Sequence, residues 1–136
     1  MKYTFHMKKN LFCSSVFILI LVSSCVKDTP LHHLIHEADV VRVYIYSGNQ
    51  IAVKYFTNDV EKIKQWDEYI ANDTVAAEHC KYEGRLVFKV YEDSTIMHFS
   101  LKAPCRVVSY DLKGIAYSKS LTPKGVEYLN SLLKIE

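Results

Sequence analysis

Six segments of the chain have the two-residue alternation or the short apolar runs that are typical of β-strands. In residues 39–46, for example, Val41, Val43 and Ile45 alternate with polar and tyrosine side chains, so one face of this strand is predicted to be buried. Turn-forming residues separate neighbouring segments, which favours hairpins. The predicted strands span residues 39–46, 51–56, 85–91, 95–101, 106–112 and 115–121.

Two further segments carry apolar residues at helical spacing. Asn58 is the expected N-cap of the first helix, where Glu61 completes a capping box, and the helix is expected to end at residues 72–73. Thr122 and Pro123 are typical of the cap and the first position of the last helix. The apolar stripes consist of Val60, Ile63, Trp66 and Ile70 in the first helix and Val126, Leu129, Leu132 and Leu133 in the second.

Together these elements predict an α+β fold with the order β-β-α-β-β-β-β-α. All strand connections except one are tight, which favours an antiparallel sheet of about six strands. Both helices are expected to pack on one face of this sheet. The other face, rich in Tyr, Lys, Ser and Thr, is expected to lie in water. Residues 74–83 are expected to form a loop.

The start of the chain has the order of a secretory signal: Lys8 and Lys9, then an apolar run over residues 11–22, then small residues. The run is about 12 residues long, shorter than the roughly 20 that a transmembrane helix needs. The sequence Val22-Ser23-Ser24-Cys25 resembles the lipobox of bacterial lipoproteins.

This resemblance implies that the chain is cut before Cys25 and that Cys25 carries lipid. Two or more acyl chains would anchor the protein stably. Val26, in place of an Asp after the cysteine, favours the outer membrane, with the domain on its periplasmic or its outer side. An ordinary cleaved signal peptide is the alternative.

Loss of residues 1–24 changes the charge of the chain. It removes three lysines and no acid, so the formal net charge of +2 becomes −1. A nearly neutral chain lacks the basic surface that nucleic-acid binding requires. The remaining length fits one domain. Residues 25–38 are expected to be an acylated cysteine and its tether, and residues 39–136 a single α+β domain.

Cys80 and Cys105 are the two cysteines of the predicted domain, and exported thiols usually pair. A hairpin that turns at residues 93–94 puts residue 82 opposite Cys105, so the two sulfurs would meet at the open end of the hairpin. The disulfide is expected to stabilise the fold by about 3 kcal/mol in the chain-entropy model. A catalytic thiol at Cys80 beside His79 is the alternative.

Three histidines, His32, His33 and His36, lie within five residues. On a helix, His32 and His36 would share a face, as paired metal ligands do. A metal site needs ligands in fixed geometry, however, and this segment falls in the predicted tether, so a solvated linker without metal is expected. His98 is predicted to lie on a strand surface, with no partners for a catalytic triad. No cofactor is expected.

Tyrosine is the residue type in excess. Four tyrosines could project from one sheet face, namely Tyr44, Tyr46, Tyr91 and Tyr117. Because tyrosine offers a large contact area with a polar tip, this face is a candidate binding surface for a partner protein or a glycan. Packing in half-buried strands is the alternative explanation.

Two functions follow from these patterns. The first is a membrane-anchored envelope lipoprotein that acts as a small binding or structural module without catalytic activity. The second is a metal-handling protein or a hydrolase that uses His79, His98 or the His32–His36 cluster. Convergence of these histidines with acidic partners in one pocket would favour the second.

Overall fold

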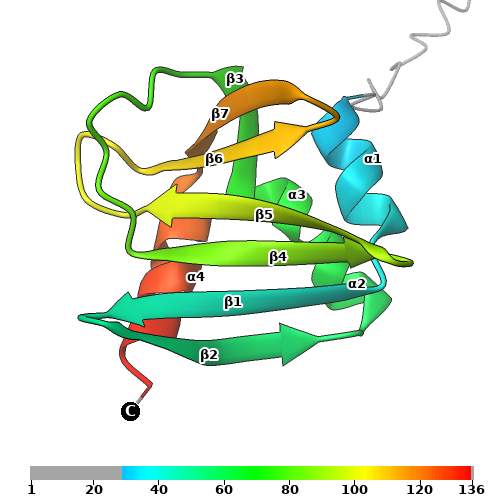
Figure 1. Ribbon diagram of the computed structural model, residues 1–136, viewed down its shortest axis with the longest axis horizontal. Coiled ribbons are helices and arrows are strands. Elements are labelled where there is room, and N and C mark those ends of the chain that lie inside the picture. The colour runs from blue at the N-terminus through cyan, green and yellow to red at the C-terminus, as the bar shows by residue number, and fades with distance from the viewer. Residues whose placement is uncertain (1–28, 136) are drawn as a thin grey trace, which may run out of the picture.

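A seven-stranded antiparallel sheet forms the centre of the structure, which is a computed structural model that describes residues 29–135 (Figure 1). The strands are β1 (Val40–Ser47), β2 (Gln50–Thr57), β3 (Ile70–Thr74), β4 (Gly84–Val90), β5 (Asp93–Ser100), β6 (Val107–Leu112) and β7 (Ile115–Leu121). Their order across the sheet is β2-β1-β4-β5-β6-β7-β3. The predicted α+β class and antiparallel sheet are therefore confirmed, with one strand more than expected.

Helices cover one face of this sheet. They are α1 (Pro30–Glu37), α2 (Val60–Lys64), α3 (Trp66–Tyr69) and α4 (Pro123–Leu133), and α2, α3 and α4 lie behind the sheet in Figure 1. All four contribute buried side chains to one core, together with the inward residues of the strands. Trp66 lies at its centre, where its ring makes edge contacts with Phe88, Tyr69 and Tyr128 at centroid distances of 5.9, 5.3 and 5.7 Å.

The segment assigned to a tether from the sequence is largely helical. The Thr29 side chain accepts a hydrogen bond from the His32 N–H, and Pro30 occupies the first turn of α1. Leu31, Leu34 and Ile35 are buried against the core. The expected boundary at residue 39 is therefore wrong, because an apolar stripe ties residues 30–37 to the domain. The lipobox and Cys25 lie outside the described residues.

The first predicted helix is interrupted and shorter than expected. Asp59, not Asn58, is its N-cap, and its carboxylate accepts from the Glu61 and Lys62 N–H groups. Helix α3 ends at Tyr69, and the chain continues as β3. Ile70 pairs with Leu121 of β7. The edge of β7 offers hydrogen bonds and a buried position to the β-branched Ile70, and this tertiary contact outweighs the helical pattern.

The β4–β5 hairpin turns two residues earlier than predicted. Val90 pairs with Asp93, so the turn is Tyr91-Glu92, and Tyr91 adopts a left-handed φ of 52°. The expected disulfide between Cys80 and Cys105 is present despite this difference, with a Cα–Cα distance of 5.8 Å.

The two cysteines of the disulfide lie in loops beyond the paired strand residues. The error in the predicted strand register therefore did not affect the predicted cysteine pairing. Cys80 is bonded, so the catalytic-thiol alternative is wrong.

Candidate functional site

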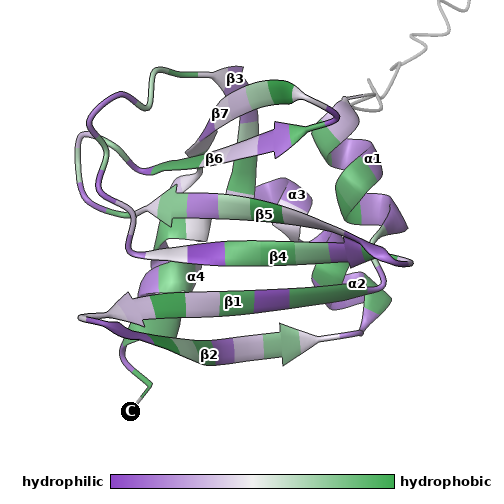
Figure 2. Cartoon of the chain, in the orientation of Figure 1, coloured by the Kyte–Doolittle hydropathy of each residue, from purple (hydrophilic) through white to green (hydrophobic). Residues whose placement is uncertain are grey.

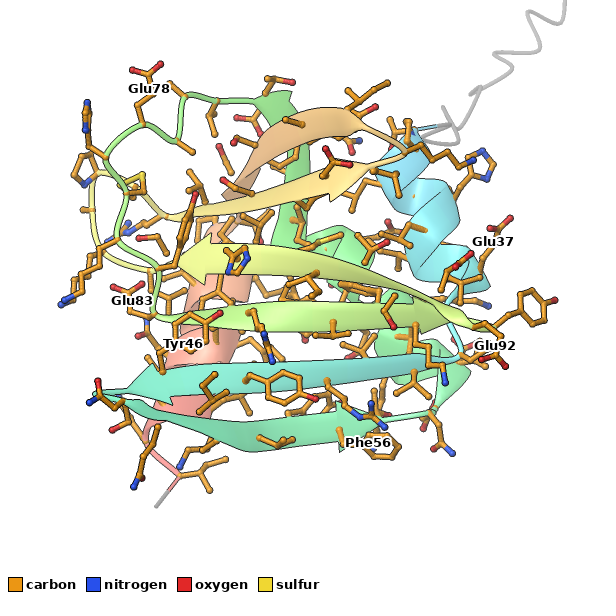
Figure 3. The ribbon with its side chains drawn as sticks, viewed as in Figure 1. Glu37, Tyr46, Phe56, Glu78, Glu83 and Glu92 are labelled. Carbon is orange, nitrogen blue, oxygen red and sulfur yellow. A yellow bond between two sulfur atoms is a disulfide. The ribbon has the colours of Figure 1, made fainter. Side chains whose placement is uncertain are left out.

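The sheet face opposite the helices is the first candidate site, and we call it the open face. It consists of the outward residues of β2, β1, β4 and β5, and Figure 3 shows Tyr46 and Phe56 on this side of the sheet. Cross-strand pairing places the following side chains on it: Arg42, Tyr44, Tyr46, Ile51, Val53, Phe56, Arg85, Val87, Lys89, Ile96 and His98. Figure 2 shows that both apolar and hydrophilic residues occur along these strands.

Exposed apolar side chains lie on the edge strand of the open face. Ile51, Val53 and Phe56 are 56%, 55% and 52% exposed, respectively. They lie on β2, which pairs only with β1 in the described sheet. Adjacent exposed apolar residues of this kind are typical of an interaction surface, and an edge strand is a further place where another chain can add.

Arginine side chains cover the aromatic rings of the open face. The Arg42 guanidinium carbon lies 5.4 Å from the centre of the Phe56 ring, and that of Arg85 lies 4.8 Å from the centre of the Tyr44 ring. Neither arginine, nor Lys89, forms an ion pair within residues 29–135. No Asp or Glu occupies an outward position on these four strands. These four strands therefore present cationic and apolar side chains, and the first acidic side chain on this side of the sheet is Asp111 of the neighbouring strand β6, beside Ile96.

His98 lies at one side of the open face in an aromatic environment. Its Nδ1 lies 3.2 Å from the Tyr46 hydroxyl, and its ring packs against Tyr82 at a centroid distance of 5.5 Å. A shallow hollow beside it is lined by Tyr82, His98, Ser109 and Ser118, and also by the acidic residues Glu78 and Asp111. Within residues 29–135, His98 forms no hydrogen bond or ion pair with either carboxylate, and its side-chain contacts are with Tyr46 and Tyr82.

The four tyrosines that were expected to share one face do not do so. Tyr44 and Tyr46 lie on the open face, whereas Tyr91 is in the β4–β5 turn and is 82% exposed. Tyr117 lies on the helix-covered side, stacked on Tyr110 at 5.3 Å. The register explains this, because Tyr110 lies between Tyr117 and the buried Met97 on neighbouring strands, and side chains that pair directly share a face.

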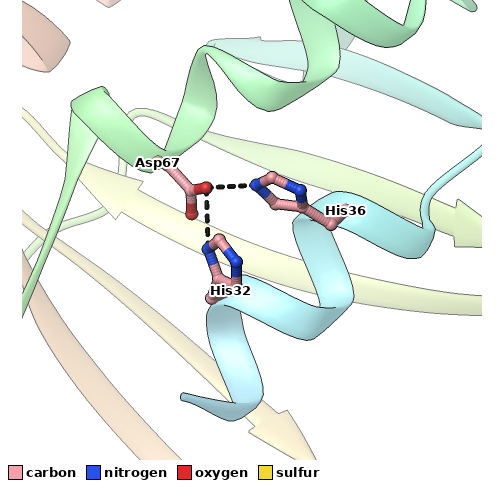
Figure 4. Close-up of side chains that lie close together, drawn as sticks. All are labelled: His32, His36 and Asp67. Atoms are coloured by element: carbon pink, nitrogen blue, oxygen red, sulfur yellow. Dashed lines mark hydrogen bonds and ion pairs between the residues drawn. The ribbon is translucent and has the colours of Figure 1, made fainter. Parts of the chain in front are cut away.

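A second candidate site is the His–His–Asp cluster of His32, His36 and Asp67 (Figure 4). One carboxylate oxygen of Asp67, Oδ2, lies 2.9 Å from His32 Nδ1 and 2.5 Å from His36 Nε2. The two imidazole rings lie 4.0 Å apart, since residues four apart on α1 share a helix face. The spacing of the histidine pair was visible in the sequence, whereas the place of Asp67 was not, because α3 brings it from a distant part of the chain.

The remaining histidines named from the sequence do not join either site. His79 lies in the loop between β3 and β4 with a left-handed φ of 65°, next to the disulfide-bonded Cys80. His33 is on α1 and lines a groove between that helix and the β6–β7 hairpin. The histidines at 79, at 98 and in the His–His–Asp cluster therefore lie in three separate places.

Strongly shifted pKa values occur on the helix-covered side of the sheet. Burial raises the pKa of Tyr110 to about 12, and neighbouring Tyr117 adds to the shift. Burial and a hydrogen bond with Tyr55 also raise the pKa of Tyr128. Both tyrosines contact the core, so these shifts reflect packing and identify no acid–base pair in the described chain.

Comparison of the chain with protein-family models, with curated proteins and with solved structures finds no significant match. None of the helices within residues 29–135 is long and apolar enough to span a lipid bilayer.

Proposed function

We propose that this chain is a lipid-anchored binding module of the bacterial envelope, and that its partner is a protein that docks on the open face. The lipobox ending at Cys25 supports the anchor. The cationic and apolar character of the open face carries the docking proposal, because this surface is left uncovered by the domain's own helices.

The anchor would hold the domain close to the membrane. Only residues 26–29 separate Cys25 from the start of α1 at Pro30. At roughly 3.3–3.6 Å per residue, five residue steps reach no more than about 18 Å. A lipidated Cys25 would therefore keep the start of α1 within about 18 Å of the bilayer surface, so that a partner in or on the same membrane is accessible to the domain.

The chemistry of the open face favours a protein over a glycan. Sugars stack on free faces of aromatic rings, whereas Arg42 and Arg85 cover the rings of Phe56 and Tyr44. Exposed aliphatic side chains such as Val53 suit an apolar protein surface. Because the cations of this face have no internal acidic partner, the expected partner presents carboxylates around an apolar centre.

The alternative function, a hydrolase that uses His79 or His98, has less support. Neither histidine forms a hydrogen bond or ion pair with a carboxylate within the described residues. Metal handling by the His–His–Asp cluster is a separate question, because that cluster does not involve the open face.

Site-specific photo-crosslinking in the native envelope tests the docking proposal. A photoreactive side chain at Val53, on the open face, should yield one discrete protein adduct. The same side chain at Glu127, exposed on α4, should not yield it. The double charge reversal Arg42→Glu and Arg85→Glu should abolish the adduct at Val53. An adduct of equal yield from both positions, or one that survives the charge reversal, would contradict the proposal.

The anchor needs its own test. Metabolic labelling with palmitate should mark the wild-type chain and not a Cys25→Ser variant, and the variant should leave the membrane fraction. Equal labelling of both chains would exclude Cys25 as the lipidated residue. This result is independent of the crosslinking result, so the anchor and the docking surface can fail separately.

A further inference from the structure

We propose that His32, His36 and Asp67 bind a zinc ion. The histidine pair alone gave no reason to expect one, because the sequence placed it in a flexible tether. The structure replaces this tether with a helix and adds a carboxylate to the pair. The proposal is independent of the docking function, since the His–His–Asp cluster lies on the helices and not on the open face.

Helix α1 holds His32 and His36 in a fixed position. Helix α1 is capped by Thr29 and held by three buried side chains, Leu31, Leu34 and Ile35. These residues fix the rotation of the helix about its axis. The adjacent stripe, which carries His32 and His36, therefore faces α3 in a defined orientation. Fixed ligands of this kind are what a specific metal site requires.

The donor atoms of the three side chains lie close together. His32 Nδ1, His36 Nε2 and an oxygen of Asp67 all lie within 4.8 Å of one another. Zinc bonds of about 2.0–2.1 Å in a tetrahedral site place ligand atoms roughly 3.3 Å apart. The Asp67 oxygen now lies 2.9 and 2.5 Å from the two nitrogens. Zinc would require this carboxylate to move outward by less than about 1 Å, and the two nitrogens, which now lie within 4.8 Å of each other, to take the same tetrahedral spacing.

The chemistry of the three ligands favours zinc over other metals. Two imidazoles and one carboxylate are a ligand set that zinc accepts with three protein ligands and one water. The side chains of His32, Asp67 and His36 are 21%, 24% and 35% exposed, which leaves a side open for that water. Calcium and magnesium prefer oxygen ligands, so the two nitrogens disfavour them.

Zinc would fasten the start of the domain. Asp67 is 35 residues from His32 and 31 residues from His36, so the ion would bridge α1 to α3 across separate parts of the chain. Without the ion, the two histidines remain hydrogen-bonded to Asp67. Binding would therefore change the strength of this connection and not the fold.

Zinc binding by the full-length protein in detergent micelles tests the proposal. Competition with a chromophoric chelator should show one zinc ion per chain. His36→Ala should weaken binding by about 100-fold or more, since loss of outer-shell partners alone costs 10–100-fold. His33→Ala is the matched control, because His33 is on the same helix but outside the cluster, and it should bind within about threefold of wild type. Zinc should raise the Tm of the wild type and of His33→Ala, but not that of His36→Ala.

Two results would overturn the proposal. If the wild type binds no zinc, the cluster is only a hydrogen-bonded histidine–aspartate group. If His36→Ala binds zinc as tightly as the wild type, the ion is held elsewhere. Asp67→Asn provides a second variant with nearly the same shape, and it should also lose affinity while its circular dichroism spectrum stays unchanged.

Discussion

The two faces of the sheet differ in how deeply their apolar side chains are buried. On the helix-covered side, Val43, Leu86 and Phe88 are completely buried. On the open face, Val53 and Phe56 of β2 are more than half exposed. The apolar residues of the first face are explained by the core that they form. Those of the second face have no helix over them, so the fold alone gives no reason for their apolar character.

The polar chemistry of the two faces differs in the same way. The helix-covered side holds tyrosines whose neutral form is favoured, since burial raises the pKa values of Tyr110 and Tyr128. The open face holds half-buried arginines stacked on aromatic rings. The buried centre of the helix-covered side therefore favours neutral groups, and the open face presents cations. This contrast separates what stabilises the domain from what is available for binding.

The largest expected effect is loss of the tryptophan at the centre of the core. Trp66→Ala should destabilise the domain by about 3–5 kcal/mol, because it removes a fully buried ring and leaves a cavity. Phe56→Ala on the open face is the matched control, and it should cost less than about 1 kcal/mol. Urea unfolding monitored by circular dichroism measures both. Similar losses in the two variants would mean that the open face is part of the core's stability after all.

Removal of the disulfide is expected to have the second-largest effect on the free energy of unfolding. It fastens the loop between β3 and β4, which carries Tyr82 against the open face. Replacing both Cys80 and Cys105 by Ser should lower the free energy of unfolding by about 3 kcal/mol, because the unfolded chain regains the freedom of a closed loop. The near-ultraviolet signal of the core should be retained at low urea. Loss of that signal would show that the bond supports the helix-covered side as well.

The two faces were predictable from the sequence to different degrees. Alternation in a single strand assigns Val41 and Val43 to one side and Tyr44 to the other, and this local rule identified most of the strands. It does not relate distant strands to one another. Tyr117 was assigned to the wrong face because its side depends on its pairing with Tyr110. Exposure of Phe56 likewise depends on which face the helices cover.

The starts of the helices were easier to predict from the sequence than their ends. Thr29-Pro30 has the same cap-and-proline pattern as Thr122-Pro123, which correctly predicted α4, so the start of α1 was available from the sequence. The end of α3 was not, because Ile70 continues the helical spacing and only its pairing with Leu121 makes it a strand. Asp67 joined the histidines for the same reason, since its place depends on packing between distant segments.

A smaller, pH-dependent effect on stability is expected on the helix-covered side. The pKa of Tyr110 is about 12 in the folded chain, against an ordinary value of 10.0. Between these values the unfolded chain loses the proton while the folded chain keeps it, so stability is complete below about pH 10 and falls as the pH rises towards 12. The loss is at most about 2–3 kcal/mol. Tyr110→Phe should lose less stability over this range in urea unfolding, and equal slopes in the two proteins would contradict the assignment.

The smallest effect on stability is expected for the arginines of the open face. Arg42→Ala removes a contact between a half-buried arginine and the exposed ring of Phe56, and it should cost about 1 kcal/mol, because cation–ring contacts near the surface are worth about 0.5–1 kcal/mol. Arg42→Lys keeps the charge and should be closer to wild type in urea unfolding. In photo-crosslinking at Val53, however, Arg42→Ala should reduce the partner adduct strongly, and Arg42→Lys less so. The contrary result is a loss of stability in Arg42→Ala as large as that of Trp66→Ala, with the adduct at Val53 retained. That result would mean that Arg42 stabilises the fold and does not bind the partner.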